Sequence, residues 1–348
     1  MFNIEDYNYD IDPALIAQVP ASNRDHSRLL FLNRENSSIV NHHFFDLPGL
    51  LKPGDLIVVN NTRVVPARLF GKKKSGGRVE ILVLDHNSGD GNSPRWCLLK
   101  SSKRPRKGAL LFFEKEVKGM VEDLGEGGLA RIRFSGPLAI DDLLEERGMM
   151  PLPPYIKREG NEFSSLDRLR YQTVFSTEKG AIAAPTAGLH FTKKIIERLH
   201  DAGITLVELT LHVGHGTFQP VSVTDIRKHN LQAEDFFIGS DTAEAVNHAK
   251  KEGRRVIAVG TTVVRTLESV AASAGEIRAG RGRTDLLITP GFQFKIIDGL
   301  ITNFHLPRSS LLFLVSAFGG NEFIKEAYKQ AAVNRYRFYS YGDAMLII

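Results

Sequence analysis

The stretch Leu56-Ile57-Val58-Val59-Asn60-Asn61-Thr62-Arg63 is the clearest indication of the fold in this chain. It begins with an apolar run of strand length, which follows the turn Lys52-Pro53-Gly54-Asp55 and is typical of a buried strand. A polar cluster comes directly after the run, and loops at strand ends often carry function in α/β proteins. We therefore expect an α/β fold with a functional loop at Asn60, Asn61 and Arg63.

The same character returns in the second half of the chain. Helical patterns at 192–202, 241–252 and 262–274 alternate with runs of strand type at 205–211, 255–259, 286–288 and 311–315. This alternation indicates βαβ units and a largely parallel or mixed sheet. Ser309 or Ser310 could also cap an apolar helix that begins at the last of these runs.

Residues 66–150 have a different pattern. Short apolar runs at 79–84, 96–99, 109–113, 117–121 and 129–134 are separated by turns rich in Gly, Ser and Asn, which favours a small antiparallel barrel or sandwich. The prolines between 150 and 155 suit a rigid crossing between domains. We predict a mixed-sheet α/β domain of residues 1–65 and 151–348, interrupted by an all-β barrel domain of residues 66–150.

The composition is typical of a soluble globular protein, and the use of cysteine favours the reducing cytoplasm. Of 348 residues, 42% are hydrophobic and 24% are charged, values that are ordinary for such proteins. Cys97 is the single cysteine, so no intramolecular disulfide can form. The first residues do not resemble a signal peptide, and no apolar run has membrane-spanning length. We therefore expect no membrane association, and a monomer is compatible with the sequence.

Positive charge is concentrated in the inserted module. The net charge is +5, and residues 66–108 contain eleven Lys or Arg against three Asp or Glu. This balance suits contacts with phosphate groups, although a solvated lysine-rich surface would give the same pattern. The residues that we expect to contact a nucleic-acid backbone are Lys72, Lys73, Lys74, Lys103, Arg104, Arg106 and Lys107.

Four loops combine small residues with polar side chains, and each also has an ordinary structural explanation as a turn or helix cap. They lie at 183–192, 211–220, 256–268 and 301–310. Histidine is the side chain best suited to proton transfer near neutral pH. His212 and His215 are unaccompanied by a carboxylate or cysteine cluster, so we expect no metal. No G-x-G-x-x-G, P-loop or G-x-S-x-G motif is present.

Several ordered motifs resemble the S-adenosylmethionine:tRNA ribosyltransferase-isomerase family. They are found at 15–18, 27–30, 60–69, 150–156, 171–175, 183–192, 302–307 and 336–345, and so span nearly the whole chain. The run Ala183-Ala184-Pro185-Thr186-Ala187-Gly188-Leu189-His190-Phe191-Thr192 is the most specific of them. The sequence departs from the family pattern at His215, where a small residue is usual, and at Gln232, where a histidine is common.

The resemblance implies an α/β domain interrupted by a β-barrel and a defined reaction. The ribosyl part of S-adenosylmethionine is transferred to 7-aminomethyl-7-deazaguanine, the queuosine precursor preQ1, at the wobble position of tRNA. It is isomerised to give epoxyqueuosine, with release of adenine and methionine. S-adenosylmethionine is then a consumed substrate, and no cofactor is implied. A methyltransferase that uses S-adenosylmethionine to methylate tRNA and a noncatalytic RNA-binding protein are the alternatives.

The reaction needs a base next to the sulfonium, a proton for adenine and groups that hold the nucleophile. We expect His190, His212 and His305 to transfer protons, with Asp55, Glu234 and Glu268 as the next candidates for the base. The expected substrate-binding residues are Asn60, Asn61, Arg63, Thr186, Gly188, Thr217, Thr262, Arg265, Asn303 and Arg308.

Overall fold

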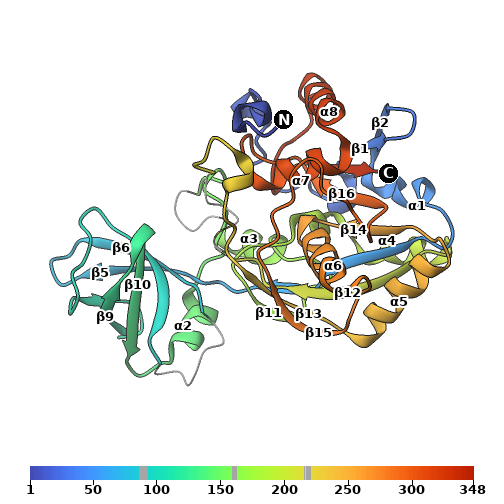
Figure 1. Cartoon of the computed structure of the whole chain (residues 1–348). Helices are drawn as coiled ribbons and strands as arrows, with labels where there is room; N and C mark the ends of the chain where they lie inside the picture. The colour runs from blue at the N-terminus through green and yellow to red at the C-terminus, as the bar shows by residue number, and fades with distance from the viewer. Residues whose placement is uncertain (86–92, 159–162, 215, 217–220) are drawn as a thin grey trace.

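The structure, a computed structural model, describes residues 1–85, 93–158, 163–214, 216 and 221–348. Figure 1 shows a body that contains a large twisted sheet, and a smaller barrel that stands apart from it at the end of a narrow crossing. The chain enters and leaves the barrel side by side, because Arg68 and Met149 exchange backbone hydrogen bonds of 3.2 and 2.8 Å. The predicted mixed α/β fold with a small β-barrel is confirmed.

Nine strands of the described residues form the mixed sheet, in the order β15-β13-β12-β3-β14-β16-β17-β1-β2. Four neighbours in its centre, β12, β3, β14 and β16, run parallel. The strands are β1 (Arg28–Asn33), β2 (Ser38–His43), β3 (Leu56–Asn60), β12 (Thr205–Leu211), β13 (Glu234–Ile238), β14 (Val256–Val259), β15 (Gly280–Thr284), β16 (Gly299–Asn303) and β17 (Ala344–Ile347).

Helices cover both faces of this sheet, which explains why the first four residues of the predicted strand at 56–60 are all apolar. Val58 packs in the core formed with α5, α6, α7 and α8, whereas Ile57 and Val59 pack in the core formed with α1 and α4. Each such side chain contributes about 1.5–3 kcal/mol when it is fully buried. The helices of the body are α1 (Leu47–Leu50), α3 (Ser164–Arg170), α4 (Lys193–Asp201), α5 (Ser240–Lys251), α6 (Thr261–Ala274), α7 (Ser310–Gly319) and α8 (Asn321–Val333).

The inserted module is a closed antiparallel barrel in the order β10-β7-β6-β5-β8-β9. Alternate residues of its strands fill one core that includes Ile81, Cys97 and Ile132, and α2 (Ile140–Arg147) covers that core with Leu143 and Leu144. The strands are β5 (Arg68–Lys73), β6 (Arg78–Val83), β7 (Arg95–Lys100), β8 (Leu110–Phe112), β9 (Lys118–Leu124) and β10 (Leu129–Ser135). Outside both sheets, β4 (Thr62–Val64) pairs in parallel with β11 (Glu178–Ala181).

Two predicted strands are wrong. The run 311–315 lies in helix α7, because the Ser309 hydroxyl accepts a hydrogen bond from the Leu312 backbone N–H and starts a helix that is buried on most sides. The run 286–288 is irregular. The strand there is β15, which stops at Thr284 because its partner β13 begins at Glu234, directly opposite.

Candidate active site

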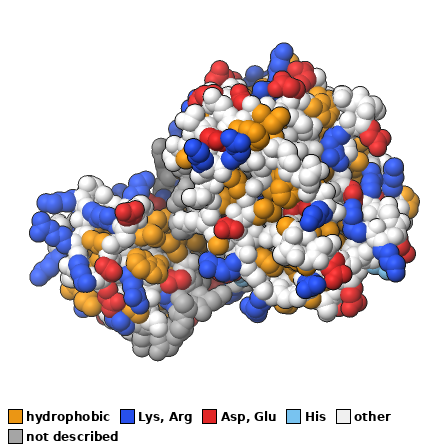
Figure 2. Space-filling view, in the orientation of Figure 1, with side chains coloured by type: hydrophobic (Ala, Val, Ile, Leu, Met, Phe, Trp, Pro, Cys, Tyr) orange, Lys and Arg blue, Asp and Glu red, His pale blue; other side chains and the backbone are white. Residues whose placement is uncertain are grey.

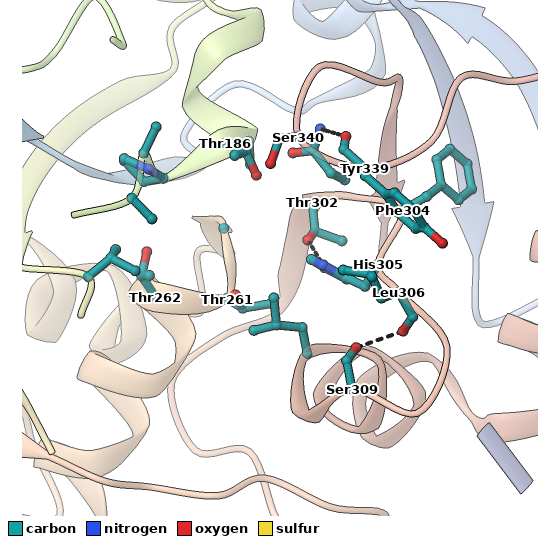
Figure 3. A pocket seen from close by; sticks show the side chains of 18 of the residues that line it. Thr186, Thr261, Thr262, Thr302, Phe304, His305, Leu306, Ser309, Tyr339 and Ser340 are labelled. Carbon is teal, nitrogen blue, oxygen red and sulfur yellow. Dashed lines mark hydrogen bonds between the residues drawn. The ribbon is translucent and has the colours of Figure 1, made fainter. Parts of the chain in front are cut away.

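A cavity of about 710 Å³, including space open to solvent, lies at the carboxyl ends of the central parallel strands. This edge of an open α/β sheet is where ligands are usually bound. Figure 3 shows Thr261 and Thr262 across the cavity from Thr302, His305 and Tyr339. The lining residues are Tyr155, Tyr171, 183–187, Val213, 260–262, 302–306, Ser309, Leu311, Tyr339 and Ser340.

The start of α6 forms one wall of this cavity. Gly260 lies between β14 and α6 with φ 91° and ψ 153°, a conformation essentially confined to glycine. It bends the chain so that the free N–H groups of the first turn of α6, at Thr261 and Thr262, lie beside the cavity. Such N–H groups carry partial positive charge and suit a carboxylate or hydroxyl of a ligand.

His305 is the histidine that lines the cavity among the described residues. Its Nε2 atom lies 2.8 Å from the Thr302 hydroxyl, and its backbone N–H donates to the Tyr328 hydroxyl at 2.9 Å. The Tyr9 hydroxyl donates to its carbonyl. Burial lowers the pKa of His305 to about 3, so the imidazole is neutral at pH 7 and holds a lone pair that can accept a proton.

His190 is buried directly behind the cavity wall. Its Nδ1 atom lies 2.7 Å from the Ser27 hydroxyl and its Nε2 atom 3.2 Å from the Asn303 amide nitrogen. It lines a separate hollow of about 290 Å³ with Arg24 and Arg170. Burial, reinforced by the charges of Arg24 and Arg337, lowers the pKa of His190 to about 3.

His212 lies outside the cavity lining, although its neighbour Val213 belongs to it. Its Nδ1 atom is 2.8 Å from the Thr62 hydroxyl, and burial lowers its pKa. The structure therefore places His305, His190 and His212 in three different surroundings, one of which is the cavity. His215 and Thr217 lie outside the described residues.

Two residues of the cavity lining each have a buried polar atom that is left unsatisfied. Within the described part of the chain, neither the Asn303 Oδ1 atom nor the Tyr171 hydroxyl has a partner in hydrogen-bonding geometry, and both residues are buried. A buried polar group without a partner costs about 1–3 kcal/mol. A bound ligand that supplied partners would remove this cost, which favours a polar ligand here.

The described residues of the cavity lining are uncharged. Among the described residues it includes no Asp, Glu, Lys or Arg, so a neutral histidine and tyrosine hydroxyls are its ionisable groups. Of the predicted binding residues, Thr186, Thr262 and Asn303 belong to this lining. Gly188 lies just behind it, where a Cβ atom would come within 2.9 Å of the Thr173 side chain.

The other predicted binding residues make contacts within the protein. Asn60 is buried and uses its amide to hold the Leu211 backbone and the Thr262 hydroxyl. Asn61 accepts from the Thr210 hydroxyl at 2.7 Å. Asn60 therefore shapes the wall at Thr262 instead of lining it.

The predicted arginines also lie outside the cavity lining. Arg265 is buried and pairs with Glu234 at 2.5 Å, and Glu234 holds the Gly214 N–H at 2.9 Å. Arg308 is exposed and pairs with Glu5 at 2.7 Å. Arg63 is exposed at the base of the crossing to the barrel, in a hollow that Lys179 and Glu145 also line.

The carboxylates that we considered as alternative bases have structural partners. Asp55 pairs with Arg255 at 2.5 Å. Glu268 accepts three backbone N–H groups, from residues 295–297, at 2.8–3.0 Å. Neither residue lines the cavity.

Several aromatic residues of this site have no role that sequence reasoning assigned. Tyr171 and Tyr339 lie in motifs of the family but outside the four loops that combine small and polar residues. The Tyr155 hydroxyl lies 2.7 Å from the Ser340 hydroxyl, and the Tyr155 and Tyr339 rings are 4.9 Å apart. Their place in the family motifs was the one signal in the sequence that could have pointed to a role in the site. Local spacing could not, because these aromatic residues come together only in the folded chain.

The two basic runs of the barrel lie side by side. The Lys73 ammonium donates to the Lys103 carbonyl at 2.9 Å, and Lys72 and Lys74 are exposed. Figure 2 shows Lys and Arg side chains gathered at the end of the barrel that is farthest from the body. Part of the Arg104 guanidinium is already engaged within the barrel, because it donates to the carbonyls of Gly125 and Leu129 at 2.7 and 2.8 Å. Lys103, Arg106 and Lys107 are also exposed.

Two further observations concern the described residues only. No three His, Cys, Asp or Glu side chains there are grouped so that they could hold a metal ion. None of the helices in that part of the chain has the length and apolar character needed to span a membrane.

Comparison with known proteins gives consistent results over the full length. Residues 4–347 match the family described as queuosine biosynthesis protein. Proteins named S-adenosylmethionine:tRNA ribosyltransferase-isomerase from Trichlorobacter lovleyi and Syntrophotalea carbinolica are 49% and 48% identical, with 99% of each chain covered. A crystal structure of the S-adenosylmethionine tRNA ribosyltransferase from Thermotoga maritima has 35% identity and a TM-score of 0.56, covering 99% of this chain and 100% of that one. On this similarity over residues 4–347, and on relatives that are nearly half identical in sequence, the chain belongs to the queuosine biosynthesis protein family.

Proposed function

We propose that this protein transfers and isomerises the ribosyl part of S-adenosylmethionine onto the preQ1 base, 7-aminomethyl-7-deazaguanine, at the wobble position of tRNA. The products are epoxyqueuosine in tRNA, adenine and methionine. Membership of the family and the names of its relatives support this reaction. The structural observation that carries the proposal is an uncharged cavity at the carboxyl ends of the parallel strands, with unsatisfied polar atoms at Asn303 and Tyr171.

The first chemical step is removal of a proton from the ribose C5′, which the neighbouring sulfonium acidifies. We assign this step to His305, since its neutral imidazole lines the cavity. The resulting ylide expels adenine, the precursor amine attacks, and methionine leaves as the epoxide closes. Because the pKa of His305 is about 3, its protonated form is a strong acid that can return the proton to the departing adenine.

The cavity walls suit the two ends of S-adenosylmethionine. The N–H groups at the start of α6, at Thr261 and Thr262, suit the methionyl carboxylate. The aromatic residues Tyr155, Phe304 and Tyr339 also line the cavity and suit a flat base. S-adenosylmethionine acts here as a substrate that is consumed, so the reaction as proposed needs no cofactor.

The barrel of residues 66–150 supplies the contact with the tRNA backbone, and the α/β domain of residues 1–65 and 151–348 supplies the chemistry. Support comes from the exposed lysines of the two adjacent basic runs. A tRNA-modifying enzyme with this composition and a single cysteine belongs in the cytoplasm.

The test is product analysis. Purified protein, given S-adenosylmethionine and tRNA that carries the precursor base, is expected to release adenine and methionine in equal amounts. Release of S-adenosylhomocysteine would instead identify a methyltransferase. Binding of tRNA with no turnover of S-adenosylmethionine would identify a noncatalytic RNA-binding protein.

A further inference from the structure

We propose that Ser27, His190 and Asn303 form a directional hydrogen-bond chain that aims the Asn303 amide oxygen into the cavity, as an acceptor for an N–H group of a substrate base. In this chain His190 is a positioning residue, which orients Asn303 and does not itself transfer a proton. The inference rests on the proposed function and adds the specificity-determining contact to it.

The direction of the chain follows from its last partner. The Asn303 amide group lies 3.2 Å from the Tyr339 backbone carbonyl, which can only accept a hydrogen bond. The atom that faces this carbonyl must therefore be the amide nitrogen, and a flipped amide would place two acceptors against each other. The orientation of Asn303 is thus determined by the backbone.

The same amide nitrogen then determines the state of His190. The Asn303 Nδ2 atom also lies 3.2 Å from the His190 Nε2 atom, so Nε2 must accept and carries no proton. A neutral imidazole then has its proton on Nδ1, which donates to the Ser27 hydroxyl at 2.7 Å. Ser27 can accept this proton because its own hydroxyl donates to the Arg24 carbonyl at 3.3 Å.

The surroundings keep this chain neutral and fixed. Ser27, His190 and Asn303 are 3%, 5% and 2% exposed, and the His190 ring stacks on Phe44 with centroids 5.1 Å apart. Burial, with the nearby charges of Arg24 and Arg337, lowers the pKa of His190 and so disfavours the imidazolium. His190 has both ring nitrogens occupied and does not line the cavity, so it is not placed to receive a proton from a substrate.

Both protons of the Asn303 amide are used, and the Oδ1 atom remains without a partner among the described residues. This oxygen can only accept, so it selects an N–H or O–H donor. Tyr171 and Tyr339 line the same cavity, which favours the amino or ring N–H of a planar base. Adenine of S-adenosylmethionine and the deazaguanine of the tRNA both offer such a donor.

The tautomer of His190 in the wild-type protein tests the hydrogen-bond chain directly. A long-range proton–nitrogen NMR correlation of the ¹⁵N-labelled full-length protein at pH 7 is expected to show His190 protonated at Nδ1 and bare at Nε2. Its signal is identified by its absence from the His190→Gln protein. A proton on Nε2, or an imidazolium, would overturn the proposal.

Turnover of two His190 variants separates positioning from proton transfer. In His190→Gln an amide oxygen can still accept from Asn303, but no proton can be transferred; in His190→Ala both functions are lost. We expect His190→Gln to keep kcat within about tenfold of the wild type and His190→Ala to lose about 10²-fold, the usual effect of a misplaced reacting group. Equal losses in the two folded variants would indicate acid–base chemistry and contradict the inference. His200→Gln, at an exposed position of α4, is the matched control.

Asn303→Ala identifies the base and remains informative if both His190 variants unfold. Loss of the acceptor should raise one Michaelis constant by about tenfold, since a buried donor is left unpaired. A rise in KM for S-adenosylmethionine alone, with weaker binding of S-adenosylmethionine by calorimetry without tRNA, assigns the contact to adenine. A rise in KM for tRNA alone assigns it to the deazaguanine. If neither constant changes while the variant stays folded, the acceptor role is wrong. Production of S-adenosylhomocysteine by the wild type would reject the proposed function and leave the NMR result standing.

Discussion

At the scale of single residues, the two enclosed histidines of the site are predicted to be neutral across the physiological pH range. The pKa values of His190 and His305 are both lowered to about 3 by burial. The unfolded chain binds a proton at each of these positions below about pH 6.5, whereas the folded chain does not. These histidines therefore make the protein less stable as the pH falls from about 6.5 towards 3.

The direction of this pH dependence can be measured. The free energy of unfolding, from urea titrations between pH 7 and pH 5, should fall with decreasing pH by up to about 1.4 kcal/mol per pH unit for each histidine. For His190→Gln, the free energy of unfolding should fall less steeply with decreasing pH than for the wild type. The difference in slope is the contribution of one histidine. Equal slopes in the two proteins would mean that His190 titrates normally.

Catalysis should depend on His305 more than on His212. Replacement of His305 by Ala should lower kcat by about 10²- to 10⁴-fold, the usual contribution of a positioned acid or base. His212→Ala should be milder, because His212 bonds Thr62 outside the cavity lining. The acid limb of the kcat/KM profile for the wild type should lie below pH 5, since the base loses activity only as it is protonated. Melting temperatures measured in parallel separate loss of chemistry from loss of fold, and a larger effect at His212 would refute the assignment.

At the scale of elements, the start of α6 combines stability with ligand binding. Gly260→Ala should destabilise the protein by about 1–3 kcal/mol, the cost of a side chain in a conformation suited to glycine. It should also raise KM for S-adenosylmethionine, because the N–H groups at Thr261 and Thr262 would shift.

The matched control lies at the other end of the same helix. Gly275 ends α6 with φ 77°, and a Cβ atom there would meet nothing within 4 Å. Gly275→Ala should cost about 1–2 kcal/mol and leave KM unchanged. Thermal unfolding and initial rates on both variants are the measurement. If KM for S-adenosylmethionine is the same in the two variants, the start of α6 is not part of the binding site.

At the scale of the whole molecule, the barrel should act as the electrostatic contact for tRNA. Replacing Lys72, Lys73 and Lys74 together by Ala should weaken tRNA binding and flatten its dependence on salt, by roughly one unit of slope for each phosphate group that the protein no longer neutralises. Lys193 and Lys194, exposed on α4 of the body, form the control pair. If the slope of the salt dependence does not change, the barrel lysines face solvent and do not contact the tRNA phosphates.

The second basic run can be tested in the same way, with one difference. Lys103, Arg106 and Lys107 are exposed, and their replacement should act on binding alone. Arg104→Ala should also lower the melting temperature, because its guanidinium holds two backbone carbonyls of the barrel. Binding titrations at several salt concentrations, with melting curves, distinguish these effects.

Local sequence patterns by themselves determined the layers of this protein. The apolar run at 56–60, the alternation of helices and strands after residue 150, and the closely spaced runs with turns between 79 and 134 all reflect the periodicity of side-chain burial, which is a property of neighbouring residues. The patterns were insufficient where contacts with distant residues decide the secondary structure. Residues 311–315 are helical because of a serine cap and enclosing neighbours, and β15 ends where its antiparallel partner β13 begins.

Only the tertiary structure decided which polar residues share the site. His305, Asn303, Thr186 and Thr262 come from three separate segments of the chain. The segments of Asn303 and Thr262 meet because β16 and β14 run parallel and end at one edge of the sheet. Histidines that looked equivalent in sequence differ in their surroundings: His190 lies behind Asn303, and His212 bonds Thr62. Tyr171 could not be assigned from its motif, since an unpartnered hydroxyl is a property of the packed interior. Spacing along a chain reports local periodicity, whereas the direction of a hydrogen-bond chain depends on partners brought together from distant segments.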